Sequence, residues 1–244
     1  MSEGVRVQKI LFLANSFGED CTAYMENITP RLFVRNLYVP ACSLEQHSEF
    51  IKKRAEVYQY QKDAVMIGDK PVSANDAFEF EKWDSIVLQQ ASFLAGKYDS
   101  YYPYLTEIIQ YIKGVCPQVK LIFNETWSYE TGSPHEKFYL YGNDSAEMIR
   151  QVRRTCERVA EENKMPLIRT GEFIQKLRRL KVFQDGSLCR DTYHLSTEYG
   201  RYAAGAFFVR HFGEDISPDF IPENAQADKI RLIRENLIKI ESHE

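Results

Sequence analysis

The sequence lacks several features that would assign the protein to a familiar class. Its five cysteines are widely spaced and include no Cys-x-x-Cys pair, so neither a disulfide framework nor a cysteine-based metal site is expected. No apolar run approaches the roughly 18 residues of a membrane span, and the N-terminus does not resemble a signal peptide. These absences predict a cytoplasmic protein without a membrane partner.

The phosphate-binding loops of nucleotide enzymes are also missing. There is no Gly-x-Gly-x-x-Gly after the first apolar run and no Gly-x-x-x-x-Gly-Lys-Ser/Thr anywhere, so dinucleotide and P-loop chemistry lack their backbone contacts. With 31 basic and 35 acidic side chains the formal charge is −4, and no Lys/Arg run is long enough for a nucleic-acid partner. We therefore expect small or neutral ligands and no metal.

Short apolar runs alternate with helix-period segments along the 244 residues, which is typical of an α/β protein with a central parallel sheet. The expected strands are residues 9–14, 32–39, 84–89, 119–124 and 165–169. The expected helices lie near residues 19–27, 43–58, 102–115, 145–163, 170–182, 197–211 and 224–241. No repeat or flexible linker interrupts this pattern, so residues 1–244 are predicted to form a single domain.

Residues 58–80 break the alternation of strands and helices. Turn residues at Gly68-Asp69 and Pro71 predict a small β-hairpin insertion there. Farther along, residues 214–226 contain two prolines and lead to the predicted terminal helix near 224–241. That helix either packs back on the domain or forms a homo-oligomer contact.

Polar side chains follow the predicted strands at the edge where an open α/β sheet binds its ligands. Asn15 and Ser16 follow the first strand, Gln89 and Gln90 the third, and Asn124 the fourth. A serine between a strand and a helix presents its hydroxyl beyond the sheet, where helix N–H groups can receive an oxyanion. The alternative interpretation is that Ser16 only caps the helix.

Asp191 and His194 lie three residues apart before the predicted helix at 197–211. This spacing lets the carboxylate reach the imidazole, and an Asp–His pair beside a serine is the arrangement of acyl-transfer enzymes. A lone Asp-x-x-His is common, so the alternative is a histidine near a helix start with an acidic neighbour.

The blocks at the two ends of the chain resemble those of the SGNH/GDSL-like hydrolases. They are Phe-Leu-Ala-Asn-Ser-Phe-Gly-Glu-Asp at 12–20 and Asp-Thr-Tyr-His-Leu-Ser at 191–196. The chain is more similar to an uncharacterised branch of that superfamily, whose nucleophile block reads Gly-Asn-Ser-Phe. Residues 42–47, 83–92 and 124–129 resemble the same branch, so the likeness spans positions 9 to about 205.

This resemblance implies a three-layer flavodoxin-like fold, with helices on both faces of the sheet, and ester hydrolysis without a cofactor. Carried over, Ser16 attacks the ester carbonyl and His194 takes its proton and returns it to the leaving alcohol. Asp191 holds the imidazole tautomer and stabilises its charged form. The implied activity is that of a serine esterase or deacetylase, and the implied substrate is a small ester such as an acetylated carbohydrate.

The resemblance also assigns an oxyanion hole, formed by the backbone N–H groups of Ser16 and Gln90 and the side chain of Asn124. Gln90 stands where the family has a glycine, and Ala14 where the branch has one. Losing one oxyanion donor costs roughly 10²–10³ in rate. The alternative function is therefore a catalytically weak or inactive module that binds a glycan or another small ligand.

Side chains near these blocks are expected to line the substrate pocket: Asn15, Gln89, Trp127 and His47. For His47 the alternative is a packed, hydrogen-bonded core residue. His135 is a candidate substrate contact, for which a surface position is the favoured alternative. Four tyrosines after the third strand suit stacking on a sugar ring, with core packing as the alternative. They are Tyr98, Tyr101, Tyr102 and Tyr104.

Overall fold

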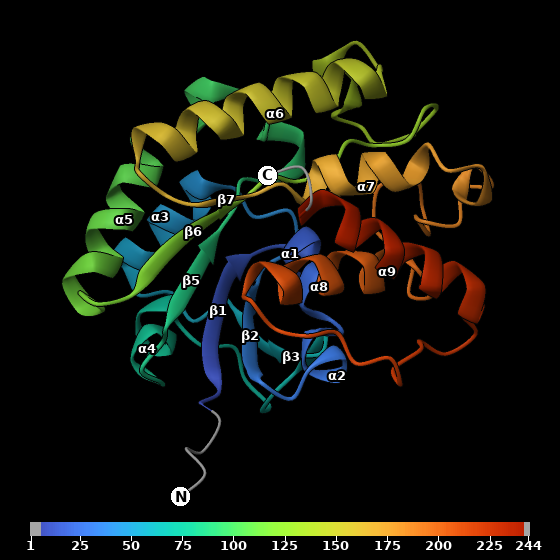
Figure 1. Cartoon of the computed structure of the whole chain (residues 1–244). Coiled ribbons are helices and arrows are strands. Elements are labelled where there is room, and N and C mark those ends of the chain that lie inside the picture. The colour runs from blue at the N-terminus through green and yellow to red at the C-terminus, as the bar shows by residue number, and fades with distance from the viewer. Residues whose placement is uncertain (1–5, 242–244) are drawn as a thin grey trace, which may run out of the picture.

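The apolar runs form the core of a seven-stranded sheet with the order β4-β3-β2-β1-β5-β6-β7 (Figure 1). The computed structural model describes residues 6–241. Five strands run parallel, namely β1 (Gln8–Ala14), β2 (Leu32–Tyr38), β5 (Ser85–Leu88), β6 (Lys120–Asn124) and β7 (Leu167–Ile168). Every residue of β5 is buried because helices cover the sheet on both faces, which is why the strand is almost continuously apolar.

A hairpin of β3 (Gln59–Lys62) and β4 (Val65–Met66) extends the sheet beside β2 with antiparallel pairing. Its turn lies at Asp63 and Ala64, which both have positive φ values of 50° and 61°. Two such residues make the turn that matches the strand twist in a two-residue hairpin. The turn therefore precedes the Gly68-Asp69 and Pro71 positions that suggested the hairpin, and a short helix, α4 (Ala74–Glu79), follows it.

Helices cover both faces of the sheet, as the sequence predicts (Figure 1). One face carries α3 (Leu44–Lys53), α4, α5 (Tyr104–Val115) and α6 (Ser145–Glu162); the other carries α1 (Ser16–Thr22), α2 (Met25–Ile28), α7 (Thr170–Arg178) and α8 (Gly200–His211). Among the described residues, four 3₁₀ turns lie between these helices, at Ser92–Leu94, Tyr98–Ser100, Phe138–Tyr141 and Lys181–Phe183. The predicted α/β fold with helices on both faces is confirmed.

The terminal helix α9 (Ala227–Glu241) packs against α8. The side chains of Ile230, Ile233 and Leu237 are buried there, so this apolar stripe is covered by the chain's own surface. Within residues 6–241, no helix is long and apolar enough to cross a membrane.

Several predicted helices differ from the observed ones at their ends, and for two of them the structure shows the reason. The first begins at Ser16 rather than near 19, because the Asn15 side chain caps its N-terminus, and it divides into α1 and α2. The helix expected over 43–58 ends at Lys53, because Arg54 takes a left-handed conformation with φ 49° and closes it.

Gly18 allows α1 to lie directly against the end of β1. A Cβ atom at this position would come within 2.2 Å of the Ala14 Cβ, which is attached to the backbone of the central strand and has no freedom to move. The helix that begins at Ser16 can therefore approach the sheet only because position 18 has no side chain.

The variant Gly18→Ala is expected to lower the free energy of unfolding by about 1–3 kcal/mol, because the methyl group overpacks this contact. Gly114→Ala in α5 is the matched control, since within the described chain its added Cβ meets no atom within 4 Å beyond its chain neighbours and the backbone of its own helix. That control should be neutral or stabilising by up to about 1 kcal/mol. Urea unfolding of both variants measures the difference, and equal stability of the two would contradict the close approach.

Candidate active site

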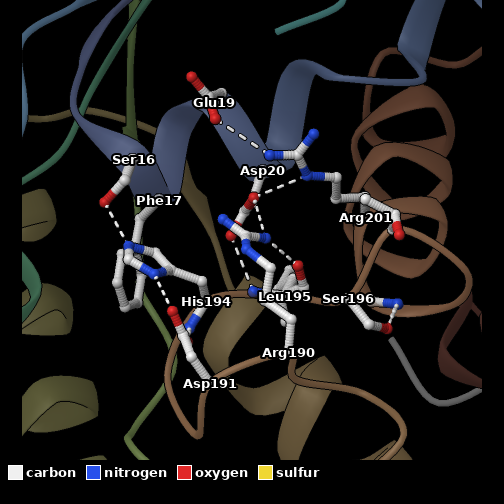
Figure 2. A network of polar contacts seen from close by, with 12 residues as sticks. Ser16, Phe17, Glu19, Asp20, Arg190, Asp191, His194, Leu195, Ser196 and Arg201 are labelled. Carbon is white, nitrogen blue, oxygen red and sulfur yellow. Dashed lines mark hydrogen bonds and ion pairs between the residues drawn. The ribbon is translucent and has the colours of Figure 1, made fainter.

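Three side chains, one near the N-terminus and two from the loop before α8, form one line of hydrogen bonds at the carboxyl edge of the sheet (Figure 2). Ser16 Oγ lies 2.9 Å from His194 Nε2, and His194 Nδ1 lies 2.6 Å from Asp191 Oδ2. Ser16 and His194 are half-buried, so both can be reached from solvent. This arrangement lets the imidazole take a proton from the serine hydroxyl while the carboxylate holds the ring.

Asp191 is held by the backbone of its own loop. Its Oδ1 accepts hydrogen bonds from the N–H groups of His194, at 2.7 Å, and Tyr193, at 3.3 Å. Thr192 has a positive φ of 74°, which turns the chain tightly enough for these contacts. Partial burial on its own would raise the pKa of Asp191, but the hydrogen bonds from His194 outweigh it and lower the pKa. The carboxylate is therefore ionised at neutral pH.

Ser16 owes its position to the residue before it. The Asn15 Oδ1 accepts a hydrogen bond from the Phe17 N–H at 3.0 Å, and its Nδ2 donates to the Cys42 carbonyl oxygen at 3.0 Å. The first bond caps the helix, and the second ties it to the segment after β2. Ser16 is thereby the first residue of α1, directly beyond the central strand.

A chain of buried amides continues from Asn15 across the sheet. Gln89 Nε2 donates to Asn15 Oδ1 at 2.9 Å, and Asn124 Nδ2 donates to Gln89 Oε1 at 3.0 Å. Thr170, at the start of α7, closes the chain by donating its hydroxyl to Asn124 Oδ1 at 2.7 Å. The ends of three parallel strands and a helix start are thus locked together beneath Ser16.

The residues expected to contact the substrate lie inside the protein. Asn15, Gln89, Trp127 and His47 are each at most 2% exposed. Polar residues at strand ends suggest an open pocket, but here the amides of Asn15 and Gln89 are hydrogen-bonded to each other in the interior. These side chains support the site from behind rather than lining its surface.

Trp127 and His47 show what such burial does. The Trp127 ring stacks on Phe17 with centroids 4.2 Å apart, and its Nε1–H donates to the Tyr193 carbonyl oxygen at 2.7 Å. The fully buried His47 ring stacks on Tyr58, and burial lowers its pKa to about 3, so it stays neutral. Its Nδ1 lies 3.0 Å from the Tyr58 hydroxyl oxygen, so His47 is the packed, hydrogen-bonded residue of the alternative interpretation.

Of the three predicted oxyanion donors, the Asn124 side chain is turned inward. Its Nδ2 donates to Gln89 and to Cys21 Sγ, and the residue is 1% exposed. The Gln90 side chain is also engaged, since its Oε1 accepts from the Leu44 N–H at 2.9 Å. Without Asn124, the predicted oxyanion hole is left with two donors, the backbone N–H groups of Ser16 and Gln90.

The rings of Tyr193 and His135 form an aromatic group beside His194 that the sequence does not predict as a group. The Tyr193 ring lies 4.3 Å from the His194 ring, and the His135 ring lies 4.9 Å from that of Tyr193. Both Tyr193 and His135 are half-buried. Tyr193 stands inside the Asp-x-x-His block, which is a local signal, whereas nothing in the sequence places the loop of His135 here.

The four tyrosines expected near the pocket serve other contacts. Tyr98 and Tyr102 donate their hydroxyls to Glu162 on α6, at 2.8 and 3.0 Å, and Tyr104 donates to Glu45. Tyr101 is completely buried. Contacts between helices therefore account for this cluster.

A family model described as "Domain of unknown function (DUF4886)" matches residues 9–238. The chain belongs to the DUF4886 family. No curated protein matches this DUF4886 chain. A solved DUF4886 protein from Bacteroides uniformis is 28% identical to it, covers 96% of this chain and 94% of its own, and has a TM-score of 0.84.

Solved structures outside the family share the fold. A proposed SGNH hydrolase from Slackia heliotrinireducens is 17% identical over 85% of the DUF4886 chain and 100% of its own, with a TM-score of 0.61. A catalytic mutant of an acetylxylan esterase from Geobacillus stearothermophilus is 15% identical over 88% and 98%, with a TM-score of 0.53. The resemblance to the SGNH superfamily is confirmed at the level of the fold.

Glu125 is a buried titratable residue next to this site. Its Oε1 accepts a hydrogen bond from the Glu172 N–H at 2.8 Å, whereas its Oε2 is buried without a partner in the described part of the DUF4886 chain. Burial raises the pKa of Glu125 to about 7, although the hydrogen bond from Glu172 opposes the shift. The folded protein therefore binds this proton more tightly than the unfolded chain does.

The stability contributed by protonated Glu125 should be present at pH 4–5 and lost as the pH rises through about 7. The change amounts to roughly 3 kcal/mol of unfolding free energy. Glu125→Gln should remove this pH dependence, while Glu136→Gln, at a side chain 81% exposed, should retain it. Urea unfolding at pH 5 and pH 8.5 gives the free energy of unfolding of both variants. If the difference between the two pH values in Glu125→Gln equals that of the wild type, the assignment is contradicted.

Proposed function

We propose that this protein is a serine esterase of the SGNH type, with Ser16 as nucleophile, His194 as general base and acid, and Asp191 as the residue that orients the ring. The observation that carries the proposal is the continuous hydrogen-bond line from Ser16 through His194 to Asp191. The fold shared with SGNH hydrolases supports it. So does the lowered pKa of Asp191, which favours a negative charge beside the imidazole.

In the proposed reaction, Ser16 Oγ attacks the ester carbonyl carbon and transfers its proton to His194 Nε2. The backbone N–H groups of Ser16 and Gln90 stabilise the resulting oxyanion. The intermediate then expels the alcohol, which takes the proton from His194, and leaves an acyl group on Ser16. A water molecule then gives a proton to His194 as it attacks the acyl-enzyme. The bond to Ser16 Oγ breaks, the carboxylic acid leaves, and His194 returns the proton to the serine.

We further propose that the substrate is an acetylated carbohydrate. Two half-buried rings, Tyr193 and His135, lie beside His194 and offer apolar faces of the kind that pack against a sugar ring. The Geobacillus neighbour is an acetylxylan esterase, which supports the same class of ester. The inward amide of Asn124 favours the second candidate, a glycan-binding module with an incomplete oxyanion hole.

A fluorophosphonate should form a covalent adduct on Ser16, because the imidazole activates its hydroxyl. His194→Ala should reduce the labelling rate by about 10⁴-fold or more, since it removes the base. His211→Ala in α8, outside the hydrogen-bond line, should label like the wild type. Intact-mass spectrometry followed by peptide mapping measures each adduct. Folded wild-type protein without an adduct at Ser16 would instead favour the glycan-binding module.

Tyr193→Ala should raise the KM for an acetylated xylo-oligosaccharide about 3- to 10-fold, the loss of one aromatic contact. It should leave the KM for p-nitrophenyl acetate nearly unchanged, because that ester has no sugar ring. Tyr139→Ala, at a tyrosine 62% exposed, is the matched control for both substrates. Acetate release and nitrophenol absorbance provide the rates, and equal effects on the two esters would argue against a sugar contact at Tyr193.

A further inference from the structure

Asp20 is a carboxylate with no exposed surface, placed in the helix that begins with Ser16. Its Oδ2 accepts a hydrogen bond from the Leu195 N–H at 2.8 Å (Figure 2). Its Oδ1 accepts from Arg190 Nη1 at 2.9 Å and from Arg201 Nε at 2.8 Å. One buried side chain therefore joins α1, the loop that carries His194, and α8.

The groups that Asp20 holds stand directly beside the proposed acid and base. Arg190 precedes Asp191, and Leu195 follows His194. The Arg190 guanidinium also donates to the Leu195 carbonyl oxygen, and the Arg190 N–H donates to the His194 carbonyl oxygen at 2.9 Å. Asp20 thus holds both ends of a short loop that is already closed at its base.

Asp20 and Ser16 lie four residues apart in α1, which places them one helical turn apart on the same side. The path from Ser16 to His194 therefore runs along one turn of helix, across the Asp20 carboxylate, and through the Leu195 backbone. Each link in this path is a helical turn or a hydrogen bond, so Asp20 is placed to set the separation between Ser16 Oγ and His194 Nε2.

The energetics favour a role beyond stability. A buried ion pair contributes little net stability over apolar residues of the same volume, because both charges must lose their water. The neighbouring Glu19 shares Arg201, at 3.0 Å, and accepts from Gln61 at 2.9 Å. Within the described residues, none of the Glu19 hydrogen bonds reaches the loop of His194. Both carboxylates pair with Arg201, but only Asp20 also holds that loop, so comparing the two distinguishes a positioning role from charge pairing alone.

We propose that Asp20 is a positioning residue that holds the Asp191–His194 loop at the correct distance from Ser16. The inference rests on the esterase function proposed above. Asp20 acts through Leu195 and Arg190 and does not touch the substrate, because the folded chain covers it completely.

The test compares Asp20→Asn with Glu19→Gln, the same chemical change at adjacent positions. Labelling of Ser16 is followed at several fluorophosphonate concentrations, which separates the maximal labelling rate from the half-saturating concentration. Asp20→Asn should lower the maximal rate about 10- to 100-fold, the cost of misplacing reacting groups by up to 1 Å. Its half-saturating concentration should stay within about twofold of the wild type, and Glu19→Gln should match the wild type in both.

A second measurement does not depend on turnover. The proton between His194 Nδ1 and Asp191 Oδ2 should give a downfield proton NMR resonance, assigned by its absence in His194→Ala. It should persist in Glu19→Gln and broaden or vanish in Asp20→Asn. If the wild-type protein is not labelled at Ser16, the esterase function is overturned. The change of the resonance between Glu19→Gln and Asp20→Asn then still shows whether Asp20 positions the His194 loop.

Arg190→Lys covers the case in which Asp20→Asn does not fold. Lysine keeps the charge, but its side chain ends one bond short of Arg190 Nη1, the atom that donates to both Asp20 and the Leu195 carbonyl oxygen. It should lower the maximal labelling rate without changing the half-saturating concentration. Wild-type rates and an intact resonance in the folded variants, or an equal loss in Glu19→Gln, would overturn the proposal.

Discussion

The hydrogen bonds of the Asn15 side chain are the constraint on which the rest of the site depends. Its oxygen accepts from the helix and from Gln89, while its nitrogen donates to the Cys42 carbonyl. An aspartate has no donor for that carbonyl, and a buried group left unpaired costs about 1–3 kcal/mol. This gives a physical reason for asparagine immediately before Ser16, in a position where an acidic residue would fit by size.

The two halves of the candidate site rest on separate supports. Ser16 is held from below by the amide chain that crosses the sheet. The loop of Asp191 and His194 is held by two other side chains. Asp20 in α1 accepts a hydrogen bond from the Leu195 N–H, and the Trp127 indole N–H donates one to the Tyr193 carbonyl oxygen. Because α1 contributes to both supports, a shift of this one short helix would disturb the nucleophile and the base together.

Much of this organisation can be predicted from the sequence, because strand and helix periods are local. The five parallel strands, and the placing of Ser16 near Asp191 and His194 at one sheet edge, follow from alternation and from the blocks at the chain ends. Burial of Gln89 and Asn124 does not follow, since each is satisfied by a partner far along the chain. The grouping of His135 with Tyr193 does not follow either, because only the folded loop brings the two rings together.

The sheet itself ends abruptly on both sides. Its outer strands, β4 and β7, are two residues long in the described chain, whereas the central β1 has seven. A short edge offers few unpaired backbone groups to a second chain. Growth of the sheet from one molecule into the next by edge-strand pairing is therefore disfavoured.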